Sequence, residues 1–265
     1  MKKWLGLLLV IAAILYTGNK SIKTTEITVE SKKIPASFNG LKIVQISDLH
    51  DATFGKNQAR LVKKIKHANP DLIFITGDLI DSNRYDLGNS LKVVEQIVSI
   101  APIYYVTGNH EISTNDVEHI KSKLADLGVH VLSNKEQIIG KNGERIRIIG
   151  IEDPLSGVSV ADALNKFKKT EDFTLVLSHR PETFQDYVDN QLDVVFTGHA
   201  HGGQFRIPGL GGLVAPGQGL FPKYTAGLYE EKDTKMIVSR GLGNSVIPFR
   251  VFNTPELVVV TLRAK

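Results

Sequence analysis

Seven side chains of the kinds that bind divalent metals follow short apolar runs of the sequence. Each run ends at serine or threonine, and a carboxylate, imidazole or amide stands just beyond it. The seven residues are Asp48, His50, Asp78, Asn109, His179, His199 and His201. Histidine and carboxylate donors without thiolates suit zinc, manganese, iron or nickel. Seven donors are too many for one tetrahedral zinc, and they suit two metals that share a carboxylate.

A metal pair of this kind activates water and takes up developing negative charge. It can lower the pKa of a bridging water toward neutrality and stabilise the charge on a transferred phosphoryl group. Glycine precedes three of the donors, at Gly77, Gly108 and Gly198, and its freedom lets the chain turn sharply there. The residue types therefore indicate metal-assisted chemistry.

The elements that must position these donors alternate between strand and helix in the first half of the chain. Apolar runs predict strands at 41–46, 72–75 and 103–106, and helical spacing predicts helices at 58–67, 87–100 and 116–127. The second half is predicted to be richer in strands, at 129–132, 145–151, 174–177, 194–196, 236–239 and 257–262, with short helices at 160–168 and 182–188. Because ligands bind at the carboxyl ends of strands in open α/β sheets, five strand ends can converge on one crevice.

The donor motifs resemble those of the calcineurin-like metallophosphoesterases. The blocks are D-x-H at 48–50, G-D at 77–78, G-N-H-E at 108–111, a single histidine at 179 and G-H-x-H at 198–201. The stretches 178–182 and 198–204 are similar to the membrane-anchored, YkuE-like bacterial branch of that family. The resemblance implies an α/β fold, a four-layer α/β/β/α sandwich of two mixed sheets.

The resemblance also implies a role for each residue of the motifs. Asp48, His50 and His201 would hold a first metal, Asn109, His179 and His199 a second, and Asp78 would bridge them. His110 would be catalytic rather than a ligand, contacting the phosphate or protonating the leaving oxygen. The spacing of the residues alone indicates a shared site but not this partition. The cofactors would be two divalent ions, manganese, zinc or iron, among which nitrogen and oxygen donors do not choose.

Other polar residues near the motifs are open to two interpretations. Taken singly, Asp48 and Asp78 fit helix caps or turns, and only the five blocks together favour a site. Arg180 can meet a substrate phosphate or form a structural ion pair, and Arg250 is a weaker candidate for substrate contact. Asp81 and Glu111 can orient ligands from behind, or they are an ordinary loop acid and helix N-terminal acid.

Residues 206–227 form a long segment rich in glycine and proline, directly after the last metal motif. Leucine, phenylalanine and tyrosine side chains are spaced along it. Long structured loops beside a site are often binding loops. We expect this segment to shape the pocket for the leaving group and to approach the membrane.

The N-terminus has the pattern of a targeting segment. Lys2 and Lys3 precede an uncharged apolar run from Trp4 to Tyr16, which predicts a signal-anchor or signal peptide over 1–18. The alternative is a buried helix of a cytosolic domain. We expect a stalk over 19–34 that enters the fold through a first edge strand, and a metallophosphoesterase domain over 35–265. The basic flank would place this domain outside the plasma membrane, anchored to it or secreted if the segment is cleaved.

Composition narrows the function further. The chain has 265 residues and no cysteine, which excludes thiol chemistry and cysteine-ligated metals. The net charge is only +4, and Lys2 and Lys3 supply half of it, so we expect no nucleic-acid partner.

We therefore expect a monomeric hydrolase of phosphoester bonds that uses a metal-bridging hydroxide, and a lipid-linked phosphoester is one candidate for its substrate. One alternative is a pyrophosphatase acting on a nucleotide-linked glycolipid, similar to UDP-diacylglucosamine hydrolases. The other is a non-catalytic metal-binding protein of the wall or membrane.

Overall fold

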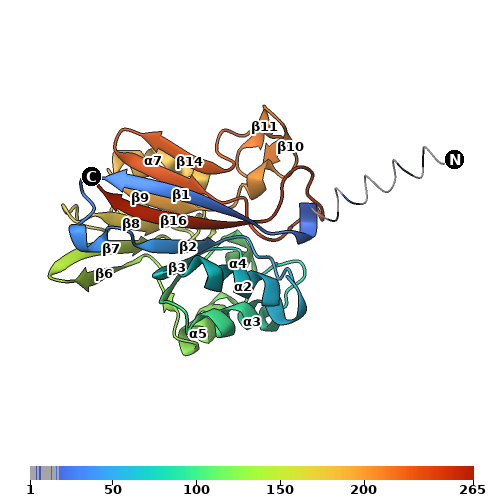
Figure 1. Cartoon of the computed structure of the whole chain (residues 1–265), viewed down its shortest axis with the longest axis horizontal. Coiled ribbons are helices and arrows are strands. Elements are labelled where there is room, and N and C mark those ends of the chain that lie inside the picture. Colours follow the sequence, from blue (N-terminus) through green and yellow to red (C-terminus); the bar gives the residue numbers. More distant parts are fainter. Residues whose placement is uncertain (1–3, 5, 7–12, 14–15, 17) are drawn as a thin grey trace.

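Two six-stranded sheets lie face to face at the centre of the computed structural model, which describes residues 4, 6, 13, 16 and 18–265 (Figure 1). The targeting segment expected over 1–18 lies almost entirely outside the described residues and stays a prediction. Within the described part of the chain, none of the helices has the length and apolar character needed to cross a membrane.

The first sheet has the order β1-β16-β2-β3-β4-β5. Its strands are β1 (Lys23–Ser31), β16 (Glu256–Ala264), β2 (Lys42–Ile46), β3 (Leu72–Thr76), β4 (Ile103–Val106) and β5 (His130–Val131). Strands β2 to β5 are parallel, and β16 runs antiparallel to β2. Every residue of β3 and β4 is buried, as expected for parallel strands covered on both faces.

The second sheet has the order β14-β15-β9-β8-β7-β6. Its strands are β14 (Gly227–Glu231), β15 (Thr234–Val238), β9 (Val194–Thr197), β8 (Thr174–Leu177), β7 (Glu144–Gly150) and β6 (Lys135–Lys141). The four central strands are parallel, and β6 and β14 are added at the edges by antiparallel hairpins. The sequence pattern does not indicate β6 or β14, because these half-exposed edge strands lack a continuous apolar run.

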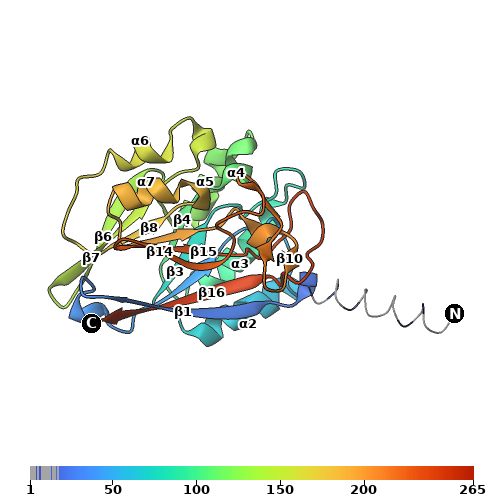
Figure 2. The same ribbon diagram turned by 90° about the horizontal axis from the view of Figure 1, so that it is seen from above.

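Helices cover the outer face of each sheet (Figure 2). Helices α2 (Ala59–Ala68), α3 (Leu87–Ile97) and α5 (Val117–Asp126) pack on the first sheet, and α6 (Val160–Leu164) and α7 (Phe184–Asp189) on the second. A central core between the sheets joins Phe74 and Tyr104 of the first to Leu175 and Phe196 of the second. The expected four-layer α/β/β/α sandwich of two mixed sheets is therefore confirmed.

The segment expected as a stalk contributes a strand to the first sheet. Strand β1 pairs in parallel with β16 from Lys23 opposite Glu256 to Ser31 opposite Ala264. This is the edge strand expected at the entry to the fold, and the first sheet therefore begins at Lys23 rather than at residue 35.

The segment 206–227, which was expected to shape a pocket, contains four two-residue strands that pair as two small hairpins. These strands are β10 (Arg206–Ile207), β11 (Gly211–Gly212), β12 (Val214–Ala215) and β13 (Gly219–Leu220).

Candidate metal centre

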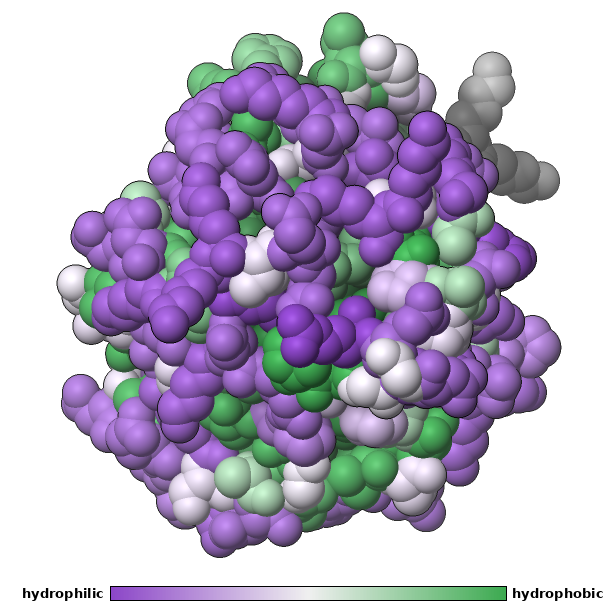
Figure 3. All heavy atoms as spheres, turned by 90° about the vertical axis from the view of Figure 1, so that its left-hand side faces the viewer, coloured by the Kyte–Doolittle hydropathy of each residue, from purple (hydrophilic) through white to green (hydrophobic). Residues whose placement is uncertain are grey.

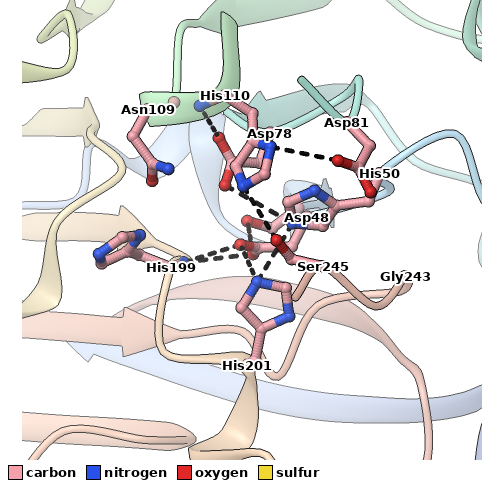
Figure 4. Close-up of polar contacts among 12 residues, drawn as sticks. Asp48, His50, Asp78, Asp81, Asn109, His110, His199, His201, Gly243 and Ser245 are labelled. Carbon is pink, nitrogen blue, oxygen red and sulfur yellow. Dashed lines mark hydrogen bonds and ion pairs between the residues drawn. The ribbon is translucent and has the colours of Figure 1, made fainter. Parts of the chain in front are cut away.

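The carboxyl ends of five strands meet at one point of the fold, as their place in the sequence predicts. Figure 4 shows Asp48, His50, Asp78 and His201 gathered there. The donors follow β2, β3, β4, β8 and β9, and the donor after β4, Asn109, stands at the start of the short helix α4 (Asn109–Ser113). All eight residues singled out by the motifs are brought together there: Asp48, His50, Asp78, Asn109, His110, His179, His199 and His201. Asn109 is half-buried and the other seven are buried.

Three groups of possible ligands lie here in the described part of the chain, one of them being His50, Asp81 and His110, and the other two share one carboxylate. Asp48, His50, Asp78 and His201 offer ligand atoms that all lie within 4.8 Å of one another. Asp78 also belongs to the second group, with His179 and His199.

The carboxylate of Asp78 has its two oxygens in different surroundings. Oδ1 accepts a hydrogen bond from the backbone N–H of His110 at 2.8 Å. Oδ2 lies 3.5 Å from His50 Nε2 and 3.2 Å from His179 Nε2, so it faces both donor groups. A carboxylate oxygen placed in this way fits a position between two cations.

Pairs of ring nitrogens also face each other at short distance. His50 Nε2 lies 3.1 Å from His201 Nε2, and His199 Nδ1 lies 3.2 Å from His179 Nε2. The Nδ1 of His179 is 2.8 Å from the carbonyl of Thr76, to which it can donate, and this leaves Nε2 free as a ligand. Converging lone pairs of this kind, without thiolate, fit divalent metals of the zinc, manganese and iron type.

The protonation of the four histidine donors depends on their burial and on the nearby carboxylates. Burial lowers the pKa of His50, His199 and His201, which favours the neutral imidazole that binds metals. Burial would also lower the pKa of His179, but the charge of Asp78, its hydrogen bond and the charges of Asp48 and Asp153 together outweigh burial and raise that pKa to about 10. A metal would replace this proton, because ligand binding needs the neutral ring.

The backbone is strained where it presents the donors. Asp48, His50, Asp78, His199 and His201 all have φ between 46° and 61°, a region that residues other than glycine rarely adopt. Five such residues at one site indicate backbone strain, which the surrounding fold maintains and which places the donor side chains close together. Close approach explains two of the motif glycines: a Cβ at residue 108 would lie 2.2 Å from Asp78 Oδ1, and one at residue 198 would lie 2.3 Å from Asp48 Oδ2.

Glu111 holds the two loops that carry Asp78 and Asn109. Its buried carboxylate accepts backbone N–H bonds from Gly108 at 2.7 Å, Asp78 at 2.9 Å, Leu79 at 2.7 Å and Ile80 at 3.1 Å. Burial, with the charge of Asp78, raises the pKa of Glu111 to about 7. Of the two interpretations left open by the sequence, this geometry favours a residue that positions the ligands.

Glu111→Gln is expected to weaken metal binding about 10- to 100-fold, although Glu111 is not in either donor group. The amide group of glutamine would turn donors toward backbone N–H groups, which leaves buried groups unpaired and lowers the melting temperature. Calorimetric titration of the metal-free protein with Mn²⁺ or Zn²⁺ measures the affinity. Glu118→Gln, on the exposed side of α5, is the matched control. Equal metal affinity in both variants would contradict the positioning role.

His110 lies beside the donors and is held by two serines that sequence analysis does not single out. Its Nδ1 accepts a hydrogen bond from the backbone N–H of Ser82 at 3.0 Å, and Asp81 Oδ1 is 3.6 Å away. Its Nε2 is 3.0 Å from Ser245 Oγ. Because a peptide N–H can only donate, the neutral ring carries its proton on Nε2. No motif signals Ser82 or Ser245, since their loops meet His110 only in the folded chain.

The two arginine candidates are placed differently. Arg180 makes a paired contact with Asp153, from Nε at 2.6 Å and from Nη2 at 3.0 Å, and its Nη1 lies 2.8 Å from His199 Nε2. Arg250 is completely buried and donates to Asn244 Oδ1 at 2.9 Å and to the carbonyls of Arg240 and Gly243. Arg250 Nη2 also lies 3.4 Å from His201 Nδ1, so Arg250 is behind a ligand, and contact with a substrate would require it to leave these bonds. Arg180 reaches the edge of the site.

Residues 242–248 contribute to the lining of two cavities. A polar cavity of about 500 Å³ includes Lys20, Thr53, Arg84 and Asn89 in its lining. A groove of about 380 Å³ is lined by five of the motif residues, together with Gln204, Ser245 and the apolar residues Val214, Ala215, Pro216, Val246 and Ile247. Three of these apolar residues belong to the segment 206–227, which was expected to shape a pocket at the site.

Comparison with known proteins agrees with the geometry. A family model for calcineurin-like phosphoesterases matches residues 41–203. The chain is 30% identical over 254 residues to the metallophosphoesterase YkuE of Bacillus subtilis, covering 94% of this chain and 88% of that one. It is 32% identical over 276 residues to a metallophosphoesterase of Campylobacter jejuni, covering 98% and 70%.

Among solved structures, the NAD nucleotidase of Haemophilus influenzae is similar, with a TM-score of 0.51 at 17% identity. The match covers 76% of this chain but only 45% of that protein, so it supports the fold alone.

Proposed function

The chain belongs to the calcineurin-like phosphoesterase family, and on that premise we propose that it hydrolyses phosphoester bonds with two divalent ions held at the five strand ends. The single observation that carries the proposal is Asp78, whose Oδ2 faces both donor groups. A site for one metal would not need a carboxylate in this position.

The ligands would be divided between the ions as the family resemblance implies. Asp48, His50 and His201 would hold one ion, and Asn109, His179 and His199 the other, with Asp78 between them. The distances support this division, because His201 Nε2 is 3.4 Å from Asp48 Oδ1, and Asn109 Oδ1 is 3.2 Å from His179 Nε2. When bound, such ions lower the pKa of coordinated water and offset the charge that builds on the phosphoryl group.

The protein's own residues orient these ligands and place a proton. Asp48 is held by Ser47 Oγ at 2.6 Å and by the backbone N–H of His199 at 3.0 Å. His110 presents Nε2–H on the side of Ser245 and the groove, where it can donate to a phosphoryl oxygen or to the leaving oxygen. Arg180, at the edge of the site, is the nearest candidate for a further phosphate contact.

We further propose that the enzyme acts outside the plasma membrane, anchored by residues 1–18 or secreted after their cleavage. The support is the basic flank of Lys2 and Lys3 before an apolar run. Fractionation of cells, followed by protease treatment of intact spheroplasts, tests this location. Protection of the protein from the protease would contradict it.

The experiment that tests the activity combines elemental analysis with a substrate panel on the purified protein. The protein should retain residues from 19 onward, because β1 belongs to the first sheet. We expect two divalent ions per chain, and hydrolysis of an aryl phosphodiester or monoester that is lost with chelation. A nucleotide-linked pyrophosphate in the panel tests the glycolipid alternative, which the apolar groove favours. Bound metal without turnover on any member would refute the proposed activity.

A further inference from the structure

One wall of the groove beside the donors is apolar. The lining includes polar residues of the site, among them Asp78, His110 and His199, and the apolar residues Val214, Pro216, Val246 and Ile247, which we call the apolar wall. Val246 is 84% exposed, so an apolar side chain stands in water directly beside the reacting groups. Such a side chain gains free energy only when something apolar covers it.

Exposed apolar residues gather on the two segments that form this wall. The five most exposed large apolar side chains of residues 18–265 are Leu210, Leu220, Phe221, Val246 and Phe252. All five lie in 206–227 or 245–252. Single exposed leucines are ordinary on protein surfaces, but the concentration of exposed apolar residues on two segments is not, and one of the five, Val246, lines the groove. By contrast, the face at the amino ends of β2, β3 and β4 is mostly hydrophilic (Figure 3).

The groove is preformed rather than a chance gap between mobile loops. Gln204 donates from Nε2 to the carbonyls of Ile247 at 3.0 Å and Phe249 at 2.7 Å, which ties the second segment to the end of the metal motif. The rings of Phe205 and Phe249 pack with centroids 5.6 Å apart. Ser245, the neighbour of Val246, contacts His110 Nε2. The apolar wall is therefore fixed in position relative to the reacting groups.

We propose that the groove binds an apolar chain esterified to the phosphate of the substrate, so that the enzyme acts on amphiphilic phosphoesters. This inference rests on the proposed function, because the phosphorus must lie at the donors for its substituent to enter the groove. A charged or strongly polar substituent would lose water there and find few partners along Val214, Pro216, Val246 and Ile247. An apolar chain would lose nothing and would cover these side chains.

The test measures binding of alkylphosphonates, which resist hydrolysis, to the full metal-loaded chain by calorimetry. Affinity is expected to rise about fourfold for each methylene from methyl to hexyl, and to level off when the groove is filled. Val246→Ser is expected to weaken binding of decylphosphonate about five- to tenfold relative to methylphosphonate. Ile138→Ser, which changes a 46% exposed side chain on edge strand β6, is the matched control and should leave this ratio unchanged.

The ratio of the affinities for decylphosphonate and methylphosphonate is taken within each variant. A general loss of folded or metal-loaded protein affects both affinities and therefore cancels in this ratio. An affinity independent of chain length, or an equal ratio in Val246→Ser, Ile247→Ser and the unchanged protein, would overturn the proposal. Failure of the proposed function is a separate result, namely no hydrolysis of any phosphoester while phosphonates still bind. Hydrolysis of a dispersed hexyl phosphoester is compared with hydrolysis of a phospholipid of the same headgroup in vesicles, which identifies the source of the chain. Hydrolysis of either one faster than hydrolysis of the methyl ester supports binding of the chain in the groove.

Discussion

Replacing Asp78 by alanine is expected to remove bound metal and hydrolysis together. Oδ2 of this residue lies within 3.5 Å of the Nε2 atoms of His50 and His179, so its loss opposes binding in both donor groups at once. The removal also leaves His179 without the charge that raises its pKa. We expect metal affinity and kcat/KM each to fall by more than about 100-fold, since even residues behind the ligands cost 10- to 100-fold.

Asp126→Ala is the matched control for Asp78→Ala. Asp126 ends α5 and is exposed, so the same chemical change there should leave metal content and turnover as they were. Elemental analysis after gel filtration and a continuous aryl phosphate assay measure the two quantities. Full activity in the Asp78 variant would refute the shared-carboxylate site.

Replacing His110 by alanine is expected to separate the two properties that Asp78→Ala removes together. His110 belongs to neither of the two groups that Asp78 joins, although it forms a third group of possible ligands with His50 and Asp81, and its Nε2 is 3.0 Å from Ser245 Oγ beside the groove. Metal content should therefore remain, while kcat falls about 10²- to 10⁴-fold, the range typical of a lost general acid.

The choice of leaving group distinguishes the two roles left open for His110. A residue that protonates the leaving oxygen matters little for 4-nitrophenol, which leaves without a proton, and much for an alkyl alcohol. Loss of a residue that only contacts the phosphate lowers kcat equally for the 4-nitrophenyl and the alkyl substrate. His119→Ala, at an exposed position of α5, is the control. Loss of metal from the His110 variant would show instead that this residue is a ligand.

The sequence alone predicts the strand ends and their donors because these signals are local. A run such as Leu72 to Ile75 predicts a buried strand, and the glycine and aspartate that follow indicate a turn that carries a ligand. The rule that ligands bind at the carboxyl ends of parallel strands then brings distant donors together without knowledge of the fold. The order and spacing of five such blocks also identify the family.

The tertiary structure decided what depends on contacts between distant segments. Only the folded chain shows that Asp78 Oδ2 faces both donor groups, that Glu111 binds four backbone N–H groups, and that Ser245 lies beside His110. It also buries Arg250, a candidate from the sequence, among backbone carbonyls, and adds β1 to the first sheet. The physical reason is that propensity and periodicity act over a few residues, whereas hydrogen-bond partners, strained dihedral angles and the apolar wall at Val246 arise from packing between segments far apart in the chain.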